Sequence, residues 1–166
     1  MLNSMVQPTD VMFIIPPHFL SVRYNGAHYP GSPNTNGLQG GANCQQFAYE
    51  LLRHFGYQIP DLRSRELWED TTHTCHVVEL VWGDLLLWNK TSDAYGAHVG
   101  VYIGAGQAIH LAKDNGYPVI DRLENFLQHP AYRVFIGAKR AYRNAEDGVY
   151  HDAVVFGLIN FEHPPQ

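Results

Sequence analysis

The clearest hydrophobic pattern along the chain lies in CQQFAYELLRHFG, which begins at Cys44. Phe47, Leu51 and Phe55 recur at about one helical turn, the spacing of a helix with one apolar face. Gly56 follows at the position where helices commonly end in a left-handed residue. The pattern therefore predicts an amphipathic helix over residues 44–55.

A second, shorter helix is predicted around residues 63–69, with Ser64 or Asp61 as its cap. Beyond Val77 the pattern changes to short apolar or alternating runs, which are GDLLLWN, HVGVYIG, QAIHLA, PVIDRL and YRVFIGAKRAYR. Such runs, separated by Gly, Asn, Asp and Pro, are typical of an antiparallel sheet. Residues 121–128 could add a helical turn, and the tail AVVFGLINF reads as one more strand or a packed extension. Because the main helix precedes the strands, the predicted fold class is α+β.

The first 43 residues are rich in Gly, Pro and Asn, which predicts loops with at most one short strand. The chain has 166 residues, a length usual for one domain. We therefore expect residues 1–166 to form a single domain. Residues 1–23 are predicted to be an N-terminal extension, and residues 144–166 a C-terminal extension.

The charge composition argues against nucleic acid as a partner. The 11 Lys and Arg residues are scattered and outnumbered by 16 Asp and Glu residues, giving a formal net charge of -5. This charge distribution lacks the basic patch that binding to nucleic acid requires. The apolar run 11–15 is too short for a membrane span or a signal peptide, and MLNSMVQPTD before it carries no Lys or Arg. Neither the compartment nor the oligomeric state follows from the sequence.

Cys44 is one of two cysteines and stands at the predicted start of the main helix. Free backbone N–H groups and the helix dipole stabilise an anion there. Together with a nearby imidazolium, such a position can lower a thiol pKa from about 8.5 to roughly 3.5–7.5. Cys44 is thus a candidate nucleophile, and the alternative is a small buried hydrophobe.

Two of the ten histidines fall on strands that a short loop connects. In HVGVYI, strand alternation places His98 and Gly100 on one face and the aliphatic residues on the other. If residues 104–106 form a three-residue hairpin loop, Gly100 lies opposite His110, and the two histidines become diagonal neighbours about 7–8 Å apart. A register shifted by one residue would separate them. The alternative is that both histidines lie on the solvated face of a hairpin.

These three residues complete a site for nucleophilic catalysis. Cys44 would attack, His98 would act as its base, and His110 would accept a hydrogen bond that fixes the His98 ring. The backbone N–H of Cys44, at the start of the helix, would donate to the oxyanion. No cofactor is needed for this chemistry.

Several segments in order resemble the NlpC-type cell-wall peptidases, a family of papain-like cysteine peptidases. They are GANCQQFAYELLRHFGYQIP, WGDLLLW, AHVGVYIGAGQAIHLA and GAKRAYR, and the resemblance covers about residues 24–143. It implies a papain-like core in which the cysteine-bearing helix packs on an antiparallel sheet. It also implies a triad of Cys44, His98 and His110. The family usually hydrolyses an amide between D-glutamate and a diamino acid, or a neighbouring bond, in the stem peptide of peptidoglycan.

The chain departs from this family at the nucleophile. Members typically carry Asp-Cys-Ser-Gly, where the Asp and Ser help to hold the free amine of the substrate, whereas this chain reads Asn-Cys-Gln-Gln from Asn43. The missing carboxylate removes a charge-assisted contact, so the chemistry could persist with a different substrate. The family also places a tyrosine before the cysteine, for which Tyr29 has the closer spacing and Tyr24 the more similar flank. The residues predicted to bind substrate are Tyr24, Tyr29, Asn43, Gln45 and Ala97.

The leading hypothesis is a cysteine hydrolase that cleaves an amide of a small, cell-wall-derived peptide without a cofactor. One alternative is a binding module that keeps the groove but does not cleave peptide, and another is an acyltransferase with the same three residues. His73, Cys75 and His76 could bind a metal together with Asp70 or Glu69, but their crowding in one short segment argues against it, and we predict no metal site. A disulfide between the two cysteines would abolish the nucleophile.

Overall fold

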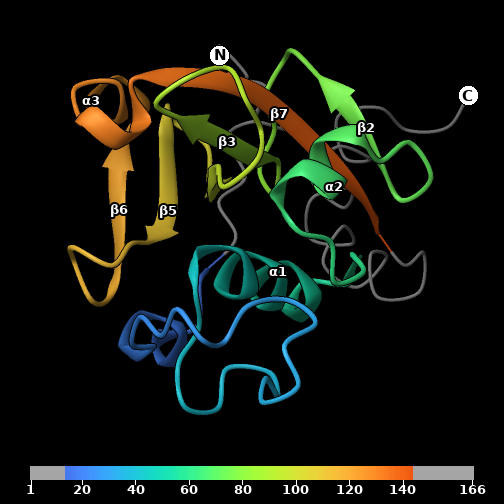
Figure 1. Ribbon diagram of the computed structural model, residues 1–166, viewed down its shortest axis with the longest axis vertical. Coiled ribbons are helices and arrows are strands. Elements are labelled where there is room, and N and C mark those ends of the chain that lie inside the picture. Colours follow the sequence, from blue (N-terminus) through green and yellow to red (C-terminus); the bar gives the residue numbers. More distant parts are fainter. Residues whose placement is uncertain (1–13, 144–166) are drawn as a thin grey trace, which may run out of the picture.

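The computed structural model describes residues 14–143, where a curled antiparallel sheet packs against helix α1 (Figure 1). The elements in chain order are the 3-10 helix η2 (Pro17–Ser21), α1 (Cys44–His54), β1 (Tyr57–Gln58), α2 (Ser64–Glu69), β2 (Thr74–Val77), β3 (Leu85–Asn89), β4 (His98–Tyr102), β5 (Gln107–Leu111), β6 (Pro118–Arg122), α3 (Leu123–Phe126), the 3-10 helix η3 (Pro130–Tyr132) and β7 (Val134–Arg143). The α+β class and the packing of the cysteine-bearing helix on the sheet are confirmed.

The sheet has the strand order β1-β7-β3-β4-β5-β6, and β2 pairs with β7 beside this path. Every pairing is antiparallel. The five strand runs expected from the sequence correspond to β3, β4, β5, β6 and β7. The strand β4 is therefore central, with β3 on one side and β5 on the other.

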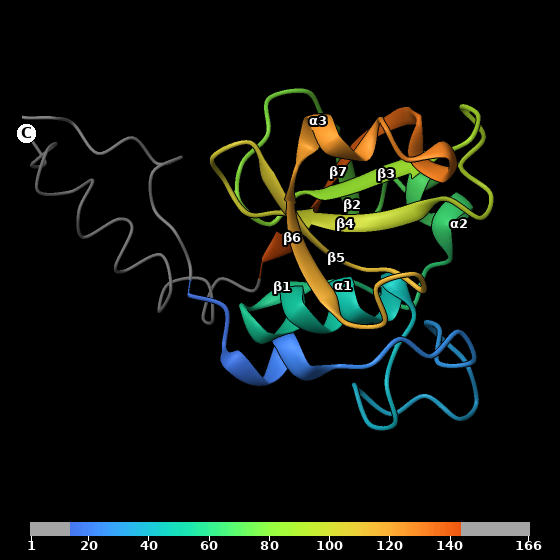
Figure 2. The same ribbon diagram turned by 90° about the vertical axis from the view of Figure 1, so that its left-hand side faces the viewer.

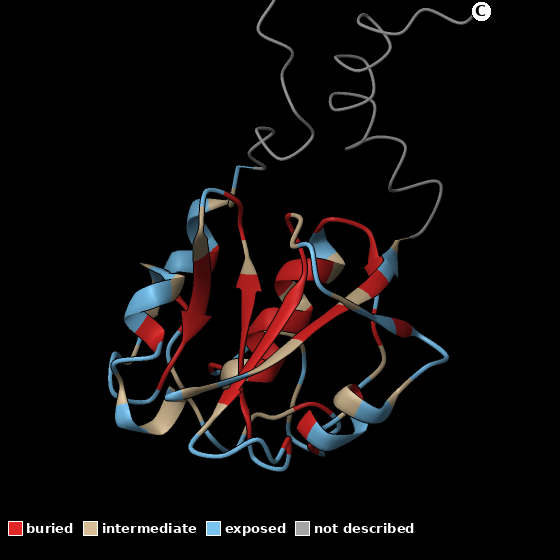
Figure 3. Ribbon diagram, turned by 90° about the horizontal axis from the view of Figure 1, so that it is seen from above, coloured by how far each residue is buried: buried red, intermediate tan, exposed pale blue. Residues whose placement is uncertain are grey.

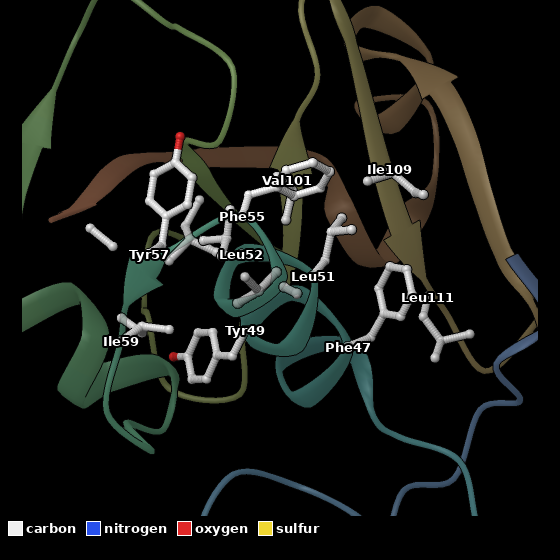
Figure 4. Close-up of a cluster of buried hydrophobic side chains, with 14 of the residues drawn as sticks. Phe47, Tyr49, Leu51, Leu52, Phe55, Tyr57, Ile59, Val101, Ile109 and Leu111 are labelled. Atoms are coloured by element: carbon white, nitrogen blue, oxygen red, sulfur yellow. The ribbon is translucent and has the colours of Figure 1, made fainter. Parts of the chain in front are cut away.

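The larger core lies between α1 and the sheet. The apolar face of the helix, including Phe47, Leu51 and Leu52, is fully buried together with the β4 and β5 residues Val101 and Ile109 (Figure 4). Burial of each such side chain contributes roughly 1.5–3 kcal/mol. Figure 3 shows the buried positions concentrated in the central strands and along α1. The helical spacing in the sequence thus identified the face that carries the core.

A second, smaller core covers the opposite face of the sheet. It consists of buried residues of the sheet and of α3, which lies across the sheet from α1 (Figure 2). Trp88 stacks on Phe126 with ring centroids 4.2 Å apart and nearly parallel planes. His98 and His110 lie on this covered face and are only 9% and 7% exposed. The alternative that they occupy a solvated hairpin face is therefore wrong, because α3 and η3 close this side of the sheet.

Local details differ from the sequence-based expectations in two places. The α2 cap is Arg63, not Ser64 or Asp61, and its backbone N–H donates to the Glu66 side chain at 3.0 Å. Strand β2, which the polar sequence TCHV did not reveal, is held by its pairing with β7. Asp70 fixes the turn before it by accepting the N–H of Thr74 at 2.7 Å. Tertiary pairing outweighs local propensity in this segment.

The N-terminal segment also contributes to the core. Residues 17–21 form a 3-10 helix where loop was expected, and Phe19 is buried against Phe47 with their ring centroids 6.3 Å apart. The division into one domain with extensions at residues 1–23 and 144–166 stays a prediction. The predicted strand in the tail AVVFGLINF lies outside the described residues. No helix within residues 14–143 combines the length and apolarity needed to cross a bilayer.

Asp84 anchors the turn that leads into β3. Its carboxylate accepts the N–H of Val81 at 2.8 Å and two N–H groups of Arg140, at 2.7 and 2.9 Å. The Asp84 side chain is fully buried. The arginine comes from β7, 56 residues farther along the chain.

Candidate active site

Cys44 is the first residue of α1, and its side chain is half-buried. The preceding residue, Asn43, caps the helix by accepting the N–H of Gln46 on its side-chain oxygen at 2.9 Å. The backbone N–H groups of Cys44 and Gln45 act to lower the pKa of the thiol. The thiol therefore lies at the positive end of the helix, as the sequence predicts.

Tyr24 reaches this site through a close contact between two loop segments. Residues 24 and 42 form an isolated parallel bridge, in which the N–H of Ala42 donates to Arg23 O at 3.0 Å. Gly41 has a φ of 97°, and a Cβ there would come within 2.5 Å of Arg23 O, so only glycine fits. The proximity of Cys44 raises the pKa of Tyr24, in addition to burial. The loop thus places the Tyr24 hydroxyl near the thiol.

The two histidines meet as the hairpin geometry predicts. The observed pairs Val101–Ile109 and Tyr102–Ala108 set the register that places Gly100 opposite His110. His98 Nε2 lies 2.8 Å from His110 Nδ1. In the tautomer that carries its proton on Nε2, His98 donates to His110 and keeps Nδ1 as an acceptor.

Gly100 provides the space for this histidine pair. A Cβ at this position would lie 3.1 Å from the Trp88 ring, 3.2 Å from Ile109 O and 3.4 Å from His110 Cβ. We expect Gly100→Ala to displace His110 and to cost about 1–3 kcal/mol of stability. Urea unfolding would measure the loss, and an unchanged free energy of unfolding would contradict this role of Gly100.

The thiol also lies next to the strand that carries His98. The backbone N–H of Val99, which belongs to the peptide bond after His98, acts on the Cys44 thiol and favours its thiolate. α1 and β4 therefore meet at the first residues of each element. The structure joins His98 to His110 and places Cys44 beside the peptide bond that follows His98, and the catalytic roles of all three stay predictions.

Burial dominates the electrostatics of these groups. Burial raises the pKa of the Cys44 thiol, although the three backbone N–H groups and the Arg63 charge oppose this shift. Burial and the neighbouring His110 hold the pKa of His98 well below its usual range. The pKa of His110 falls to about 4, mainly through burial. Cys44 and His98 are therefore both neutral near pH 7, and the expectation of a lowered thiol pKa is wrong because burial outweighs the helix terminus.

These shifts predict how the thiol reacts with iodoacetamide. Only the thiolate is alkylated, so a raised pKa moves the inflection of the rate of Cys44 alkylation above about 8.5. Mass spectrometry would follow Cys44 and, as an internal reference, the exposed Cys75. An inflection well below 8.5 that rises in His98→Ala would instead demonstrate a resting thiolate–imidazolium pair.

Tyr132 is a residue of the site that sequence reasoning missed. Its ring stacks on His98 with centroids 4.3 Å apart and on His129 with centroids 4.4 Å apart. Burial, together with the nearby Cys44, raises the pKa of Tyr132 to about 12. Tyr132 is the last residue of η3. The run YRVFIGAKRAYR predicted that a strand begins there, so no local pattern marked Tyr132 as a site residue. It covers the histidine pair on the side away from α1.

A cleft of about 410 Å³ opens beside the thiol. Its walls come from the start of α1, from α2 and from the loop before β4, and the lining residues are Tyr24, Asn43, Cys44, Gln45, Arg63, Ser64, Arg65, Tyr95, Gly96 and Ala97. Four of the five residues predicted to bind substrate line it. Tyr29 does not, and its ring instead lies under the Arg63 guanidinium, 4.1 Å from the Arg63 Cζ. Of the two candidate tyrosines, Tyr24 is the one in the cleft.

His73, Cys75 and His76, in and just before β2, do not gather around a metal position. His73 Nδ1 lies 3.2 Å from Asp70, while the His76 ring contacts Trp68 edge to face. Within residues 14–143, no group of three or more His, Cys, Asp or Glu side chains is close enough to hold a metal ion. Cys44 and Cys75 are free thiols.

The sequence matches the NlpC/P60 family over residues 26–135. A crystal structure of an NlpC/P60 family protein from Bacillus cereus ATCC 10987 is 25% identical, with a TM-score of 0.47, and the similarity covers 63% of this chain and 32% of that one. NlpC2 from Trichomonas vaginalis is 17% identical, with a TM-score of 0.50 and coverage of 77% and 43%. The NlpC/p60 domain of the peptidoglycan hydrolase SagA is 19% identical, with a TM-score of 0.49 and coverage of 76% and 92%.

The chain spans less than half the length of the first two of these structures. No curated protein gives a significant match. The likeness to NlpC2 concerns the fold, a cysteine-bearing helix on a curled antiparallel sheet. The family match covers most of the described residues, including the thiol and both histidines. The chain therefore belongs to the NlpC/P60 family.

Proposed function

We propose that the protein is a cysteine hydrolase that cleaves an amide bond of a small peptide through an acyl-enzyme on Cys44. The observation that carries this proposal is the arrangement at the start of α1. The peptide N–H that follows His98 lies close enough to the thiol to act on its pKa, and His98 Nε2 lies 2.8 Å from His110 Nδ1. In this proposal Cys44, which lines the cleft, is the nucleophile, His98 is its base and His110 orients His98.

The neutral state of the thiol and imidazole defines the order of the proton transfers. His98 takes the thiol proton as Cys44 Sγ attacks the carbonyl carbon, so the thiolate forms only with the substrate in place. The oxyanion of the tetrahedral intermediate receives the N–H of Cys44. His98 then returns the proton to the leaving amine as the C–N bond breaks. Water, deprotonated by His98, attacks the thioester and releases the acid and the free thiol.

The substrate class follows from family membership. We propose a peptidoglycan stem peptide, the usual substrate of the family that the chain resembles. Asn43 and Gln45 depart from the residues usual in that family, so the contacts to the rest of the peptide differ. The chemical step depends on Cys44 and the histidines, and these are unchanged.

A binding module without catalysis is the second candidate. The raised thiol pKa and lowered His98 pKa favour it, because a resting thiolate is absent. An acyltransferase would share the acyl-enzyme and differ in the acceptor. Both alternatives make distinct predictions for the products formed from a peptide.

The test is to incubate the protein with purified stem peptides and to identify the products by mass spectrometry. Hydrolysis in H₂¹⁸O should release an amine and an acid that carries one ¹⁸O atom. An added amine such as glycinamide would be incorporated in place of water if the protein is a transferase. Peptide that binds and stays intact over a long incubation would favour the binding module and contradict the proposed hydrolase.

A further inference from the structure

The cleft beside Cys44 has an unusual charge balance for a site expected to hold the amine of a peptide. Its ten lining residues include two arginines, and no carboxylate lines it among residues 14–143. We propose that the cleft selects ligands that carry a carboxylate near the scissile carbonyl, rather than an ammonium group, and that Arg63 binds this carboxylate. This selectivity would act at the site of the proposed function. Any effect of the selectivity on turnover therefore rests on that function.

Arg63 is positioned by an aromatic ring and not by an acidic side chain. The guanidinium lies over the Tyr29 ring, with Cζ 4.1 Å from the ring centroid. A stacked guanidinium keeps the N–H groups at its edge available for a planar acceptor such as a carboxylate. Of the two nearest acids along the chain, Asp61 pairs with Arg53, and Glu66 accepts the backbone N–H of Arg63. The Arg63 side chain thus meets the requirements of a preformed anion-binding group.

The other arginine of the cleft is already paired. Arg65 lies 3.3 Å from Asp93, and both side chains are more than half exposed. Arg63 forms no ion pair with any residue in the described part of the chain. The unbalanced positive charge on this wall of the cleft therefore belongs to Arg63.

Arg63 is also electrostatically coupled to the nucleophile. Its positive charge acts to lower the pKa of the Cys44 thiol. A ligand carboxylate bound by Arg63 would therefore lie close to the bond that the thiol attacks. The carboxylate would also offset part of the attraction between Arg63 and the thiolate, which is consistent with proton transfer to His98 only during the attack.

The residues around the cysteine add neutral hydrogen-bonding groups. The Asn43 side-chain oxygen accepts the N–H of Gln46 and is neutral, so it offers no negative charge to a substrate ammonium. Gln45 is 3% exposed, and its side-chain nitrogen has no hydrogen-bond partner among residues 14–143. An ammonium in this cleft would meet Arg63 and no compensating negative charge. An anionic ligand is therefore favoured.

The test compares two tripeptides that differ in one group, L-Ala-γ-D-Glu-L-Lys with a free α-carboxylate and its α-carboxamide counterpart with isoglutamine. Calorimetry would measure their binding to the Cys44→Ala protein, so that no turnover is required. We expect the carboxylate form to bind about 10- to 100-fold more tightly, the range for one charge-assisted contact. Introducing Arg63→Gln into the Cys44→Ala protein should reduce the preference for the carboxylate peptide to within about threefold.

Arg122→Gln serves as the matched control, because it removes the same charge from an exposed arginine that pairs with Glu124 and does not line the cleft. It should keep the preference for the carboxylate. Equal binding of the two peptides, a preference that survives Arg63→Gln, or no binding of either at millimolar concentration would each overturn the proposal. Absence of hydrolysis by the unmodified protein would contradict only the proposed function.

A third peptide tests the ammonium directly. N-acetylation of the alanine of the carboxylate form removes its positive charge and should change the affinity by less than about threefold. A loss of more than about tenfold would show that the cleft anchors the ammonium and would overturn the proposal.

Discussion

Replacing Cys44 with alanine should abolish peptide hydrolysis and leave the protein folded. In hydrolases whose nucleophile and base act as a unit, removing the nucleophile lowers kcat by factors up to about 10⁶, and we expect a loss of at least about 10⁴-fold here. The side chain is half-buried beside an open cleft, so the stability change should stay within about 1 kcal/mol. Product formation and thermal unfolding of the same preparation would check the two expectations.

Cys75→Ala is the matched control for this prediction. Cys75 is the other free thiol among the described residues, and it is exposed on β2. Its replacement should keep both activity and stability. If Cys44→Ala retained activity comparable to that of Cys75→Ala, the acyl-enzyme mechanism would be excluded.

Removing the carboxylate of Asp84 should be the most destabilising single change at a polar residue. Asp84→Ala leaves the guanidinium of Arg140 and the N–H of Val81 without the acceptor that they share. Breaking a fully buried ion pair on one side costs about 3–5 kcal/mol. Arg140 is 36% exposed and also donates to Glu79 O, so water screens part of this cost and we expect about 2–4 kcal/mol, a large part of the roughly 5–15 kcal/mol that stabilises a typical domain. Urea unfolding at neutral pH would give the change in the free energy of unfolding.

The control for Asp84 is the exposed pair between Arg122 and Glu124, whose atoms lie 2.7 Å apart. The distance matches that between Arg140 and Asp84, but both side chains are more than 60% exposed. Glu124→Ala should therefore cost at most about 1 kcal/mol. Similar losses in the two variants would show that burial does not govern the strength of the Asp84 pair.

Local patterns were enough to predict the elements that carry Cys44, His98 and His110. The helical spacing after Cys44 and the short loop 104–106 each define geometry over a few residues, and the structure has both the helix and the hairpin register. The fold class followed from the order of these elements. The close approach of the two histidines was predictable because a hairpin register depends only on its own loop.

Features that depend on distant segments could not be predicted. The choice between Tyr24 and Tyr29 was decided by a bridge between two loops, for which spacing along the chain gives no rule. The sign of the thiol pKa shift depended on how much protein surrounds Cys44, which no sequence pattern reports. The same is true of Arg63, which joins the cleft because α2 begins beside it.

The ring of Tyr132, between His98 and His129, has a consequence for how this fold can be recombined. The β4–β5 hairpin resembles an independent structural unit, because it carries both histidines and its own loop. Yet the side of His98 away from α1 is completed by η3, which follows two further elements in the chain. A chimera that imported only the hairpin from a relative would therefore combine one parent's histidines with the other parent's aromatic cover. The smallest exchangeable unit extends from β4 through η3, residues 98–132.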